Sequence, residues 1–578
     1  MAVIYRVNMS DLSVRAEEPQ DGRKELGGRG LTSMLVADEV PATCHPLSAE
    51  NKLVIAPGIL TGTGAPCSGR LSAGAKSPLT GTIKESNSGG QGGLALAALG
   101  IQAIVLEGKP ADRRLYRLVV NADGLRIEPA DDLAGLGNYD AVARHFEEYG
   151  DKIACLSIGQ AGEMQTPAAS IAVTDVEGRP TRHCGRGGLG AVMGSKRVKA
   201  IVVDPAGGKR TQPADAEAFR AAVKKFADCL KKHPLTGQTL PKYGTNALAN
   251  VINEAGGYPT RNFSDGRFEG TEPISGERQH DVIVERGGVI AHACHRGCTI
   301  KCSRIYMDAK GEYLTKGPEY ETIWAHGADC GIDDLDAIAR MDRLDDDFGL
   351  DTIETGATIA VAMEAGIIPF GDAEAAIGLL KEVGKGTPLG RLVASGAEVL
   401  GKAYGVARVP TVKGQSMPAY DPRAIQGIGV TYATSTMGAD HTAGYSIAAN
   451  VLGVGGKVDP LRPEGQLELS RNLQIATATI DATGLCLFVA FAMLDDPAAM
   501  EAVCELLGGL YGRKFTADDY LAMGKRILAW ERRFNSAAGF GPADDRLPDF
   551  FKTEKLAPHG AMFSVPDEEL DQLFSFVE

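Results

Sequence analysis

The sequence lacks the features of most membrane-spanning and nucleic-acid-binding proteins. No apolar run reaches the 18 or more residues that favour a membrane span, and the longest candidate, from Leu94, is interrupted at Gly100. Acidic residues outnumber basic ones by 74 to 60, and five or six like charges never follow one another. A net charge of −14 without a basic block argues against nucleic acid or an anionic membrane as the main partner.

The pattern of an export signal is also missing. Arg6 and Asp11 stand where such a signal needs its apolar stretch, and no small-residue cleavage site follows. We therefore expect a cytoplasmic protein. In that compartment the 11 cysteines are expected to serve metal ligation, catalysis or packing rather than disulfides.

Glycine, in contrast, is abundant, with 72 among 578 residues against an average of about 7%. One glycine-rich phrase occurs twice: G-x-G-G-L begins at Gly90 and again at Gly185, each time followed by a helical stretch and the strand-like triplet A-I-V. Each copy predicts a turn leading into a helix N-terminus, where free N–H groups can bind an anion such as phosphate. Two alternatives stay open here, namely two anionic groups bound side by side or two tight turns needed for packing.

The second copy also matches G-x-G-x-x-G at Gly185, Gly187 and Gly190. A dinucleotide site needs a strand immediately before these glycines, and the preceding EGRPTRHC is not strand-like. We do not expect NAD to bind there.

The sequence pattern changes from strand-like to helical near Gly207. Short β-branched runs such as KLVIAPG and VKAIVVDP precede it, and helical periodicity begins at Ala214 and continues almost to the end, with an interruption at Pro410 to Pro418. We predict an α+β protein with a β-rich domain over 1–207, a mainly helical domain over 208–412 and a mainly helical C-terminal domain over 413–578.

Three cysteines, Cys294, Cys298 and Cys302, lie within nine residues. A [4Fe–4S] cluster needs four thiolates, commonly three from one segment and one from elsewhere. Arg296, Lys301 and Arg304 would offset the negative charge of such a cluster. Zinc bound with His292 or His295 is a rival interpretation, and inert thiols are another.

The candidates for a fourth ligand are Cys330, Cys486 and Cys504. Cys486 is preferred because Gly484, two residues before it, lets the backbone approach a bulky group, whereas Cys504 lies in a helical, core-like stretch. The remaining cysteines stand singly and are expected to be structural: Cys44, Cys67, Cys155, Cys184, Cys229 and Cys330.

With these phrases in view, the sequence resembles the tungsten-containing aldehyde:ferredoxin oxidoreductase family along nearly its whole length. The matching phrases follow the family's order: GGRGLTS from Gly27, PGILTGTGAPCSGR ending at Arg70, SNSGGQGG from Ser86, GRGGLGAVMGSK from Gly185, GPEYET from Gly317, FGLDTIETG from Phe348, GADH ending at His441 and DATGLC ending at Cys486.

The resemblance implies a tungsten bis-pterin cofactor between a β-rich domain and two helical domains, with one [4Fe–4S] cluster nearby. It implies cluster ligands Cys294, Cys298, Cys302 and Cys486, and an Mg²⁺ ion bridging the pterin phosphates through Asn87 and the backbone carbonyl of Cys184. Further pterin contacts implied by motif position are Arg70, Asn87, Gly89, His183, Cys184, Gly185, Arg186, Asp346, Leu350, Asp351, Asp481 and Leu485.

Glu321 and His441 match the family's acid/base pair near the metal. The expected reaction is oxidation of an aldehyde to a carboxylic acid, with electrons leaving through the cluster to ferredoxin or an iron–sulfur partner subunit that docks near Arg296, Lys301 and Arg304. We also expect the chain to be part of an oligomer.

Two other functions are weighed against this one. The tungsten subunits of ring reductases act on aromatic thioesters and share the implied fold, but GADH and PEYET favour the aldehyde branch. A non-catalytic iron–sulfur electron-transfer subunit, or a zinc-stabilised scaffold, would carry neither tungsten nor molybdenum.

Overall fold

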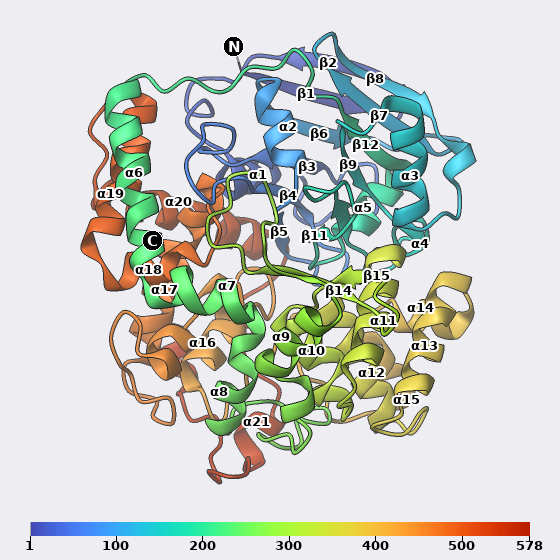
Figure 1. Ribbon diagram of the computed structural model, residues 1–578, viewed down its shortest axis with the longest axis vertical. Helices are drawn as coiled ribbons and strands as arrows, with labels where there is room; N and C mark the ends of the chain where they lie inside the picture. Colours follow the sequence, from blue (N-terminus) through green and yellow to red (C-terminus); the bar gives the residue numbers. More distant parts are fainter. Residues whose placement is uncertain (1, 578) are drawn as a thin grey trace.

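The computed structural model describes residues 2–577 and consists of two six-stranded sheets above a larger helical body (Figure 1). The strand order of the first sheet is β2 (Ser13–Glu17), β1 (Val3–Asn8), β6 (Ile101–Glu107), β3 (Leu53–Pro57), β4 (Leu71–Lys76) and β5 (Ile83–Ser88). That of the second is β8 (Gly124–Pro129), β7 (Tyr116–Asn121), β12 (Val198–Val203), β9 (Ala154–Ser157), β10 (Ile171–Val173) and β11 (Arg182–Cys184). The predicted α+β class is confirmed.

The two sheets repeat one topology. Strand β1 runs parallel to β6, as β7 does to β12, and the other neighbours in both sheets are antiparallel. Helices α2 (Gly92–Ala98) and α5 (Leu189–Ser195) follow the two glycine-rich phrases and lie at equivalent points of the two halves. The repeated phrase is therefore part of a duplicated fold.

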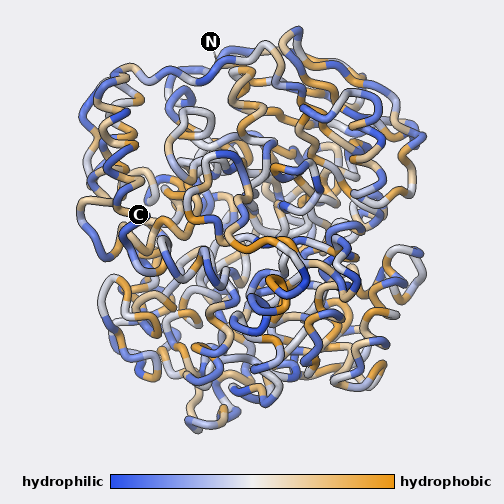
Figure 2. Tube along the Cα trace, in the orientation of Figure 1, coloured by the Kyte–Doolittle hydropathy of each residue, from blue (hydrophilic) through white to orange (hydrophobic). Residues whose placement is uncertain are grey.

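Apolar side chains fasten the two sheets to each other. Ile55 and Ile104 of the first sheet share a core with Leu156 and Ile201 of the second. Helix α1 (Gly28–Glu39) covers the outer face of the first sheet and α3 (Asn138–Tyr149) that of the second. Figure 2 shows hydrophobic stretches along the strands of this upper half and hydrophilic ones at its outer turns.

The mainly helical part of the chain begins where the periodicity predicts it, with α6 (Ala216–Lys232), whose N-cap Asp215 accepts the backbone N–H groups of Glu217 and Ala218. The segment runs beside α19 (Pro497–Tyr511) at the edge of the molecule (Figure 1). The other helices of the lower body include α7 (Leu240–Tyr243), α8 (Leu248–Glu254), α9 (Gly276–Glu285), α10 (Tyr320–His326), α11 (Leu335–Phe348), α12 (Thr352–Glu364), α13 (Ala373–Lys385), α14 (Pro388–Val393), α15 (Ala397–Tyr404), α16 (Gln426–Thr434), α17 (Gln466–Thr483), α18 (Val489–Asp495), α20 (Ala517–Ala537), α21 (Phe550–Thr553) and α22 (Asp567–Leu570).

Strand structure also occurs where the sequence did not suggest it. The segment before Gly185, interpreted as not strand-like, contains β11, but this strand is antiparallel to β10 and so does not form the parallel unit of a dinucleotide fold. Inside the mainly helical region, β13 (Val289–His292), β14 (Ser303–Met307) and β15 (Tyr313–Lys316) form a small sheet around the cysteine segment. A hairpin of β16 (Thr411–Val412) and β17 (Gln415–Ser416) spans the predicted boundary at 412, and the division into domains stays a prediction.

No helix among residues 2–577 is both long and apolar enough to cross a membrane.

A buried ion pair joins the first helix to the C-terminal region. Arg29 of α1 donates two hydrogen bonds of 2.8 Å to Glu531 of α20 and a third of 3.1 Å to Asp481 of α17. Ser33 and Thr436 donate to the same Glu531 carboxylate, at 2.8 and 2.6 Å. Glu531 thus connects segments that lie far apart in the chain.

Replacing Glu531 by Ala is expected to lower the free energy of unfolding by about 3–5 kcal/mol, because it leaves the buried Arg29 guanidinium without its main partner. Chemical denaturation measures this change. The matched control is Glu501→Ala, at a pair with Lys225 where Glu501 is 66% exposed, which is expected to cost less than about 1 kcal/mol. Equal losses in both variants would contradict the role assigned to Glu531.

Candidate functional site

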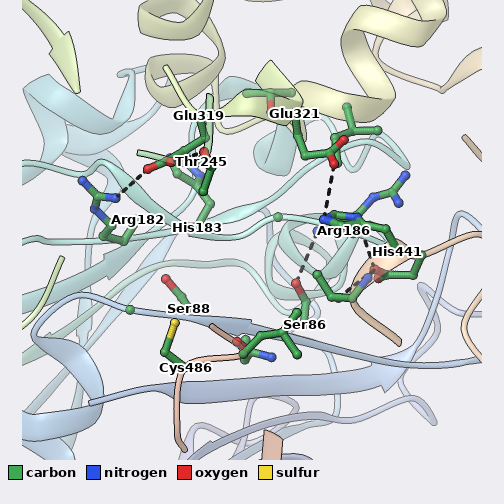
Figure 3. A pocket seen from close by; sticks show the side chains of 18 of the residues that line it. Ser86, Ser88, Arg182, His183, Arg186, Thr245, Glu319, Glu321, His441 and Cys486 are labelled. Carbon is green, nitrogen blue, oxygen red and sulfur yellow. Dashed lines mark hydrogen bonds and ion pairs between the residues drawn. The ribbon is translucent and has the colours of Figure 1, made fainter. Parts of the chain in front are cut away.

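A cavity of about 390 Å³ lies between the two sheets and the helical body, and most of the predicted site residues meet in it (Figure 3). The predicted residues that line it are Arg70, Asn87, Gly89, His183, Gly185, Arg186, Asp346, Leu350, Asp351, Asp481, Cys294, Cys298, Cys302, Cys486, Glu321 and His441. Cys184 and Leu485 do not line it, because their side chains are buried in the apolar cores.

The ends of helices deliver the acidic side chains to this cavity. Asp346 lies in the last turn of α11, Asp351 caps α12 by accepting the N–H of Ile353, and Asp481 lies in the last turn of α17. Glu321 is in the first turn of α10. Gly349 and Gly484 end α11 and α17 with φ of 73° and 77°, the left-handed conformation that glycine adopts without strain.

Basic side chains from β11, from the loop that follows it and from β15 meet these acids. Arg186 donates to Asp351 at 3.1 Å, and His183 Nε2 lies 3.0 Å from Asp346 Oδ1. Lys316 of β15 donates to the same Asp346 oxygen at 2.6 Å, and its charge holds the pKa of Asp346 below the ordinary value despite burial. Asp346 is therefore ionised at neutral pH.

Glu321 and His441 form a pair at one side of the cavity (Figure 3). Glu321 Oε1 lies 3.4 Å from His441 Nε2, while Oε2 accepts the N–H of Ala419 at 3.0 Å. Burial raises the pKa of Glu321, and the neighbouring His441 opposes this shift. His441 Nδ1 in turn lies 3.9 Å from Asp440 Oδ1. A carboxyl group with a raised pKa beside an imidazole is suited to proton transfer.

Aromatic rings enclose this pair. The ring centroids of Tyr420 and Tyr445 lie 5.8 and 6.0 Å from that of His441, and their hydroxyl groups hydrogen-bond to each other at 2.9 Å. These rings pack against the imidazole of His441.

A chain of hydrogen bonds connects the sheet to the cysteines. Arg70 donates to Asn87 Oδ1 at 2.6 Å and lies 3.6 Å from the Cys486 sulfur, and Asn87 donates to Asp481 at 3.2 Å. Arg70 thus contacts both the polar part of the cavity and a predicted cluster ligand.

The four predicted ligand cysteines reach the same region from two directions. Cys294, Cys298 and Cys302 lie on the segment between β13 and β14, and Cys486 follows α17. The other candidates are engaged elsewhere: Cys330 is buried and donates to the carbonyl of Ala325, and Cys504 is packed in α19.

The histidines of this segment bear on the zinc alternative. His292 Nε2 lies 2.8 Å from Glu177 Oε1, so this ring nitrogen points toward Glu177. His295 places a ring nitrogen near Cys294 and Cys298, the three possible ligand atoms lying within 4.8 Å of one another. Its Nδ1 is 2.9 Å from the carbonyl of Arg296, so Nε2 is the nitrogen left for any ligand.

The prediction that Arg304 meets a docking partner is wrong. Arg304 is only 2% exposed, and burial lowers its pKa to about 10. Arg296 and Lys301 are exposed, as predicted for a docking surface.

Several residues of the site were missed in the sequence. Glu85 lies two residues before Asn87 on β5, and the period of a strand places both on one face, so its position was available as a clue. Burial raises the pKa of Glu85 to about 8. The tyrosines gave no such clue, since they come from separate loops. The missed residues that line the cavity include Arg29, Glu85, Arg182, Lys316, Tyr420 and Tyr445.

Comparison with known proteins decides the family. The family described as "Aldehyde ferredoxin oxidoreductase, N-terminal domain" matches residues 4–205, and the one described as "Aldehyde ferredoxin oxidoreductase, domains 2 & 3" matches residues 221–576. The chain belongs to the aldehyde ferredoxin oxidoreductase family.

Relatives of nearly equal length support this assignment. The "Tungsten-containing aldehyde ferredoxin oxidoreductase" of Pyrococcus furiosus is 39% identical over 577 residues, with 96% of this chain and 92% of the relative covered. The protein of the same name from Thermococcus kodakarensis is also 39% identical, with the same coverage. A more distant relative, the "Aliphatic sulfonate oxidoreductase, WOR-like subunit" of Pyrococcus furiosus, is 26% identical and covers 93% of this chain and 86% of its own length.

Among solved structures, the active site complex BamBC of benzoyl coenzyme A reductase matches with a TM-score of 0.82, covering 100% of this chain and 94% of the other. At 20% identity this likeness shows a shared fold and no more. The aromatic-ring reductases, weighed above as an alternative function, thus share this fold. The relatives with higher sequence identity are named as aldehyde ferredoxin oxidoreductases.

Proposed function

We propose that this chain oxidises aldehydes to carboxylic acids, using tungsten held by two pterins, and passes the electrons through one [4Fe–4S] cluster. The observation that carries the proposal is the meeting, in one cavity, of the Glu321–His441 pair and four cysteines. Family membership and relatives whose names state tungsten, aldehyde and ferredoxin support it.

The side chains of the cavity suit a large polar cofactor. Several buried polar atoms that face it have no hydrogen-bond partner within the protein: Arg70 Nε, Glu85 Oε1, Ser88 Oγ, Arg182 Nε and Asp346 Oδ2. Each such atom costs about 1–3 kcal/mol when left unsatisfied. The ring N–H, carbonyl and phosphate groups of a pterin would satisfy donors and acceptors of these kinds.

The Mg²⁺ ion belongs to this proposal as well. Asn87 and the backbone carbonyl of Cys184 offer oxygen, which a hard cation prefers. The Cys184 thiol is buried in the core between the sheets, so the backbone is the part of this residue that is left to bind a cation. 

When bound, the tungsten–pterin group supplies oxygen transfer and accepts two electrons. Conversion of an aldehyde and water into an acid releases two protons, and the chain must remove them. Oε2 of Glu321 is held by Ala419, so Oε1 is the atom placed to accept a proton and share it with His441 Nε2. Asp440 Oδ1 lies 3.9 Å from Nδ1, the other nitrogen of the same imidazole.

Glu321→Gln and His441→Asn are expected to lower kcat by about 10²–10⁴-fold, the usual contribution of a general acid or base. Because the pKa of Glu321 is raised and its base form is the active one, the rate of the unmodified enzyme should fall as pH drops through that pKa. The Gln variant should lose this acid limb while its tungsten content stays normal. Glu374→Gln, at a carboxylate 72% exposed on α13, is the control and should leave the pH profile as it is. Loss of tungsten from the Glu321 variant would show that the residue holds the metal instead.

The cluster assignment is tested by exchanging single cysteines. Cys486→Ser is expected to abolish or alter the electron paramagnetic resonance spectrum of the reduced cluster, because it removes the one ligand outside the 294–302 segment. Cys330→Ser is the matched control, since Cys330 is also buried but its thiol donates a hydrogen bond to the carbonyl of Ala325. An unchanged spectrum in the first variant and loss of iron in the second would overturn the assignment.

Electrons are proposed to leave at the exposed side of the cysteine segment, to ferredoxin or to an iron–sulfur partner subunit. Arg296 and Lys301 are exposed there, on either side of Cys298, and an acidic carrier would meet them close to the cluster. A single cluster passes one electron at a time, so an external acceptor must take both in turn.

Changing Arg296 and Lys301 together to Glu is expected to slow reduction of an acidic ferredoxin at low ionic strength at least tenfold, because steering by charge is lost. Reduction of a viologen dye serves as the reference rate for each preparation. Lys385→Glu, on α13 and 63% exposed, should reduce ferredoxin normally. Reduction of NAD⁺ by this chain without a partner would refute the proposed electron route.

A further inference from the structure

A buried guanidinium group lies beside the cysteine segment without a partner of its own. Arg304, on β14, is 2% exposed, and its Nη1 and Nη2 atoms are buried with no hydrogen-bond partner among residues 2–577. Arginine keeps its charge in proteins, so this side chain carries a full positive charge out of contact with water. A charge at such depth is tolerated only when an anion compensates it.

Two glycines make room for this side chain. A Cβ atom on Gly244 would lie 2.6 Å from Arg304 Nε and 2.8 Å from Nη2, and one on Gly317 would clash with the Cβ of Arg304. The Cβ on Gly244 would also meet the carbonyl oxygen of Cys302, at 2.8 Å. The guanidinium group therefore lies next to the backbone of a proposed cluster ligand, in a space that a larger residue at position 244 would fill.

The carboxylate whose charge acts on Arg304 is held by other groups. Glu319 Oε2 accepts the hydroxyl of Thr245 at 2.7 Å, and Oε1 lies 3.8 Å from Arg182 Nη1 (Figure 3). Arg182 in turn donates to Ser303, the residue between Cys302 and Arg304, at 2.6 Å. One carboxylate is thus shared by two arginines, which leaves a positive charge over beside the cysteine segment.

The other two basic residues that the sequence offered for the same purpose are in a different setting. Arg296 and Lys301 are exposed, so water and salt screen their charges. Of the three, Arg304 is the one whose charge acts at low local dielectric.

We propose that Arg304 is a positioning residue that supplies the buried counter-charge of the [4Fe–4S] cluster at Cys302 and thereby raises the reduction potential of the cluster. A cluster held by four thiolates is an anion, and it becomes more negative when it takes up an electron. A fixed positive charge away from water therefore favours the reduced form. This inference rests on the cluster put forward under the proposed function.

The test compares variants of the purified holoenzyme by iron and sulfide content and by a redox titration of the cluster monitored by electron paramagnetic resonance. Arg304→Gln removes the charge and keeps a polar side chain. It is expected to keep four irons and to lower the ratio of reduced to oxidised cluster at least tenfold at a given potential, a shift of about 59 mV for one electron. Arg304→Lys keeps a charge and should titrate closer to the unmodified enzyme.

Arg296→Gln is the matched control. It makes the same substitution at an exposed arginine two residues before Cys298, and the potential should stay that of the unmodified enzyme.

Glu319 provides an independent arm. Glu319→Gln removes the carboxylate that Arg182 and Arg304 share, so it should shift the potential upward, opposite in sign to Arg304→Gln. A purely structural role of Arg304 would not produce shifts of opposite sign.

Each outcome can be assigned. Four irons with an unchanged potential in Arg304→Gln, or an equal shift in Arg296→Gln, would overturn the inference and leave the proposed function standing. Loss of iron from Arg304→Gln with four irons kept in Arg304→Lys would support it, because the charge then decides whether the cluster is held. Loss of iron from both would overturn it by giving Arg304 a structural role only. Absence of iron from the unmodified enzyme would instead refute the proposed cluster itself.

Discussion

The structure depends on ion pairs buried at the junction between the sheets and the helical body. The basic partner comes from the two sheets or their flanking segments and the acidic partner from the helical body in Arg29–Asp481, Lys84–Asp440 and Arg186–Asp351. Charges at this depth are tolerated only when paired and hydrogen-bonded. Each pair therefore holds the halves together and keeps a polar wall around the cavity.

Several of the acidic side chains lie at helix ends, and this position fixes where they enter the cavity. A carboxylate at a helix end is fixed by the backbone and can point into a cavity while the helix packs in the core. Glu321 has no lysine or arginine bonded to it and burial raises its pKa, whereas Lys84 and Arg186 hold the pKa of Asp440 low despite its burial. Within one cavity, a carboxyl group is thus suited to proton transfer in one place and is a fixed charge in another.

Sequence patterns predicted the architecture well where a local rule applies. The strands around Ile55 and Ile201, the start of α6 after Asp215 and the duplicated glycine phrase follow from periodicity, capping and turns. The sheet of β13 to β15 was missed because its strands are short and framed by glycines. Burial of Arg304 and the hydrogen bond from the N–H of Cys67 to the carbonyl of Gly297 depend on contacts between distant segments, which no local pattern encodes. Convergence of the site residues was foreseen through the family resemblance rather than through spacing alone.

The central claim is that one cavity holds tungsten beside Glu321 and His441 and an iron cluster beside four cysteines. An anomalous-difference map, from crystals of the holoenzyme measured at the tungsten and iron edges, tests it most directly. The account predicts a tungsten peak in the cavity near Glu321 and a separate iron peak surrounded by Cys294, Cys298, Cys302 and Cys486. A cavity without a tungsten peak, or a single zinc ion at Cys294, His295 and Cys298, would contradict it.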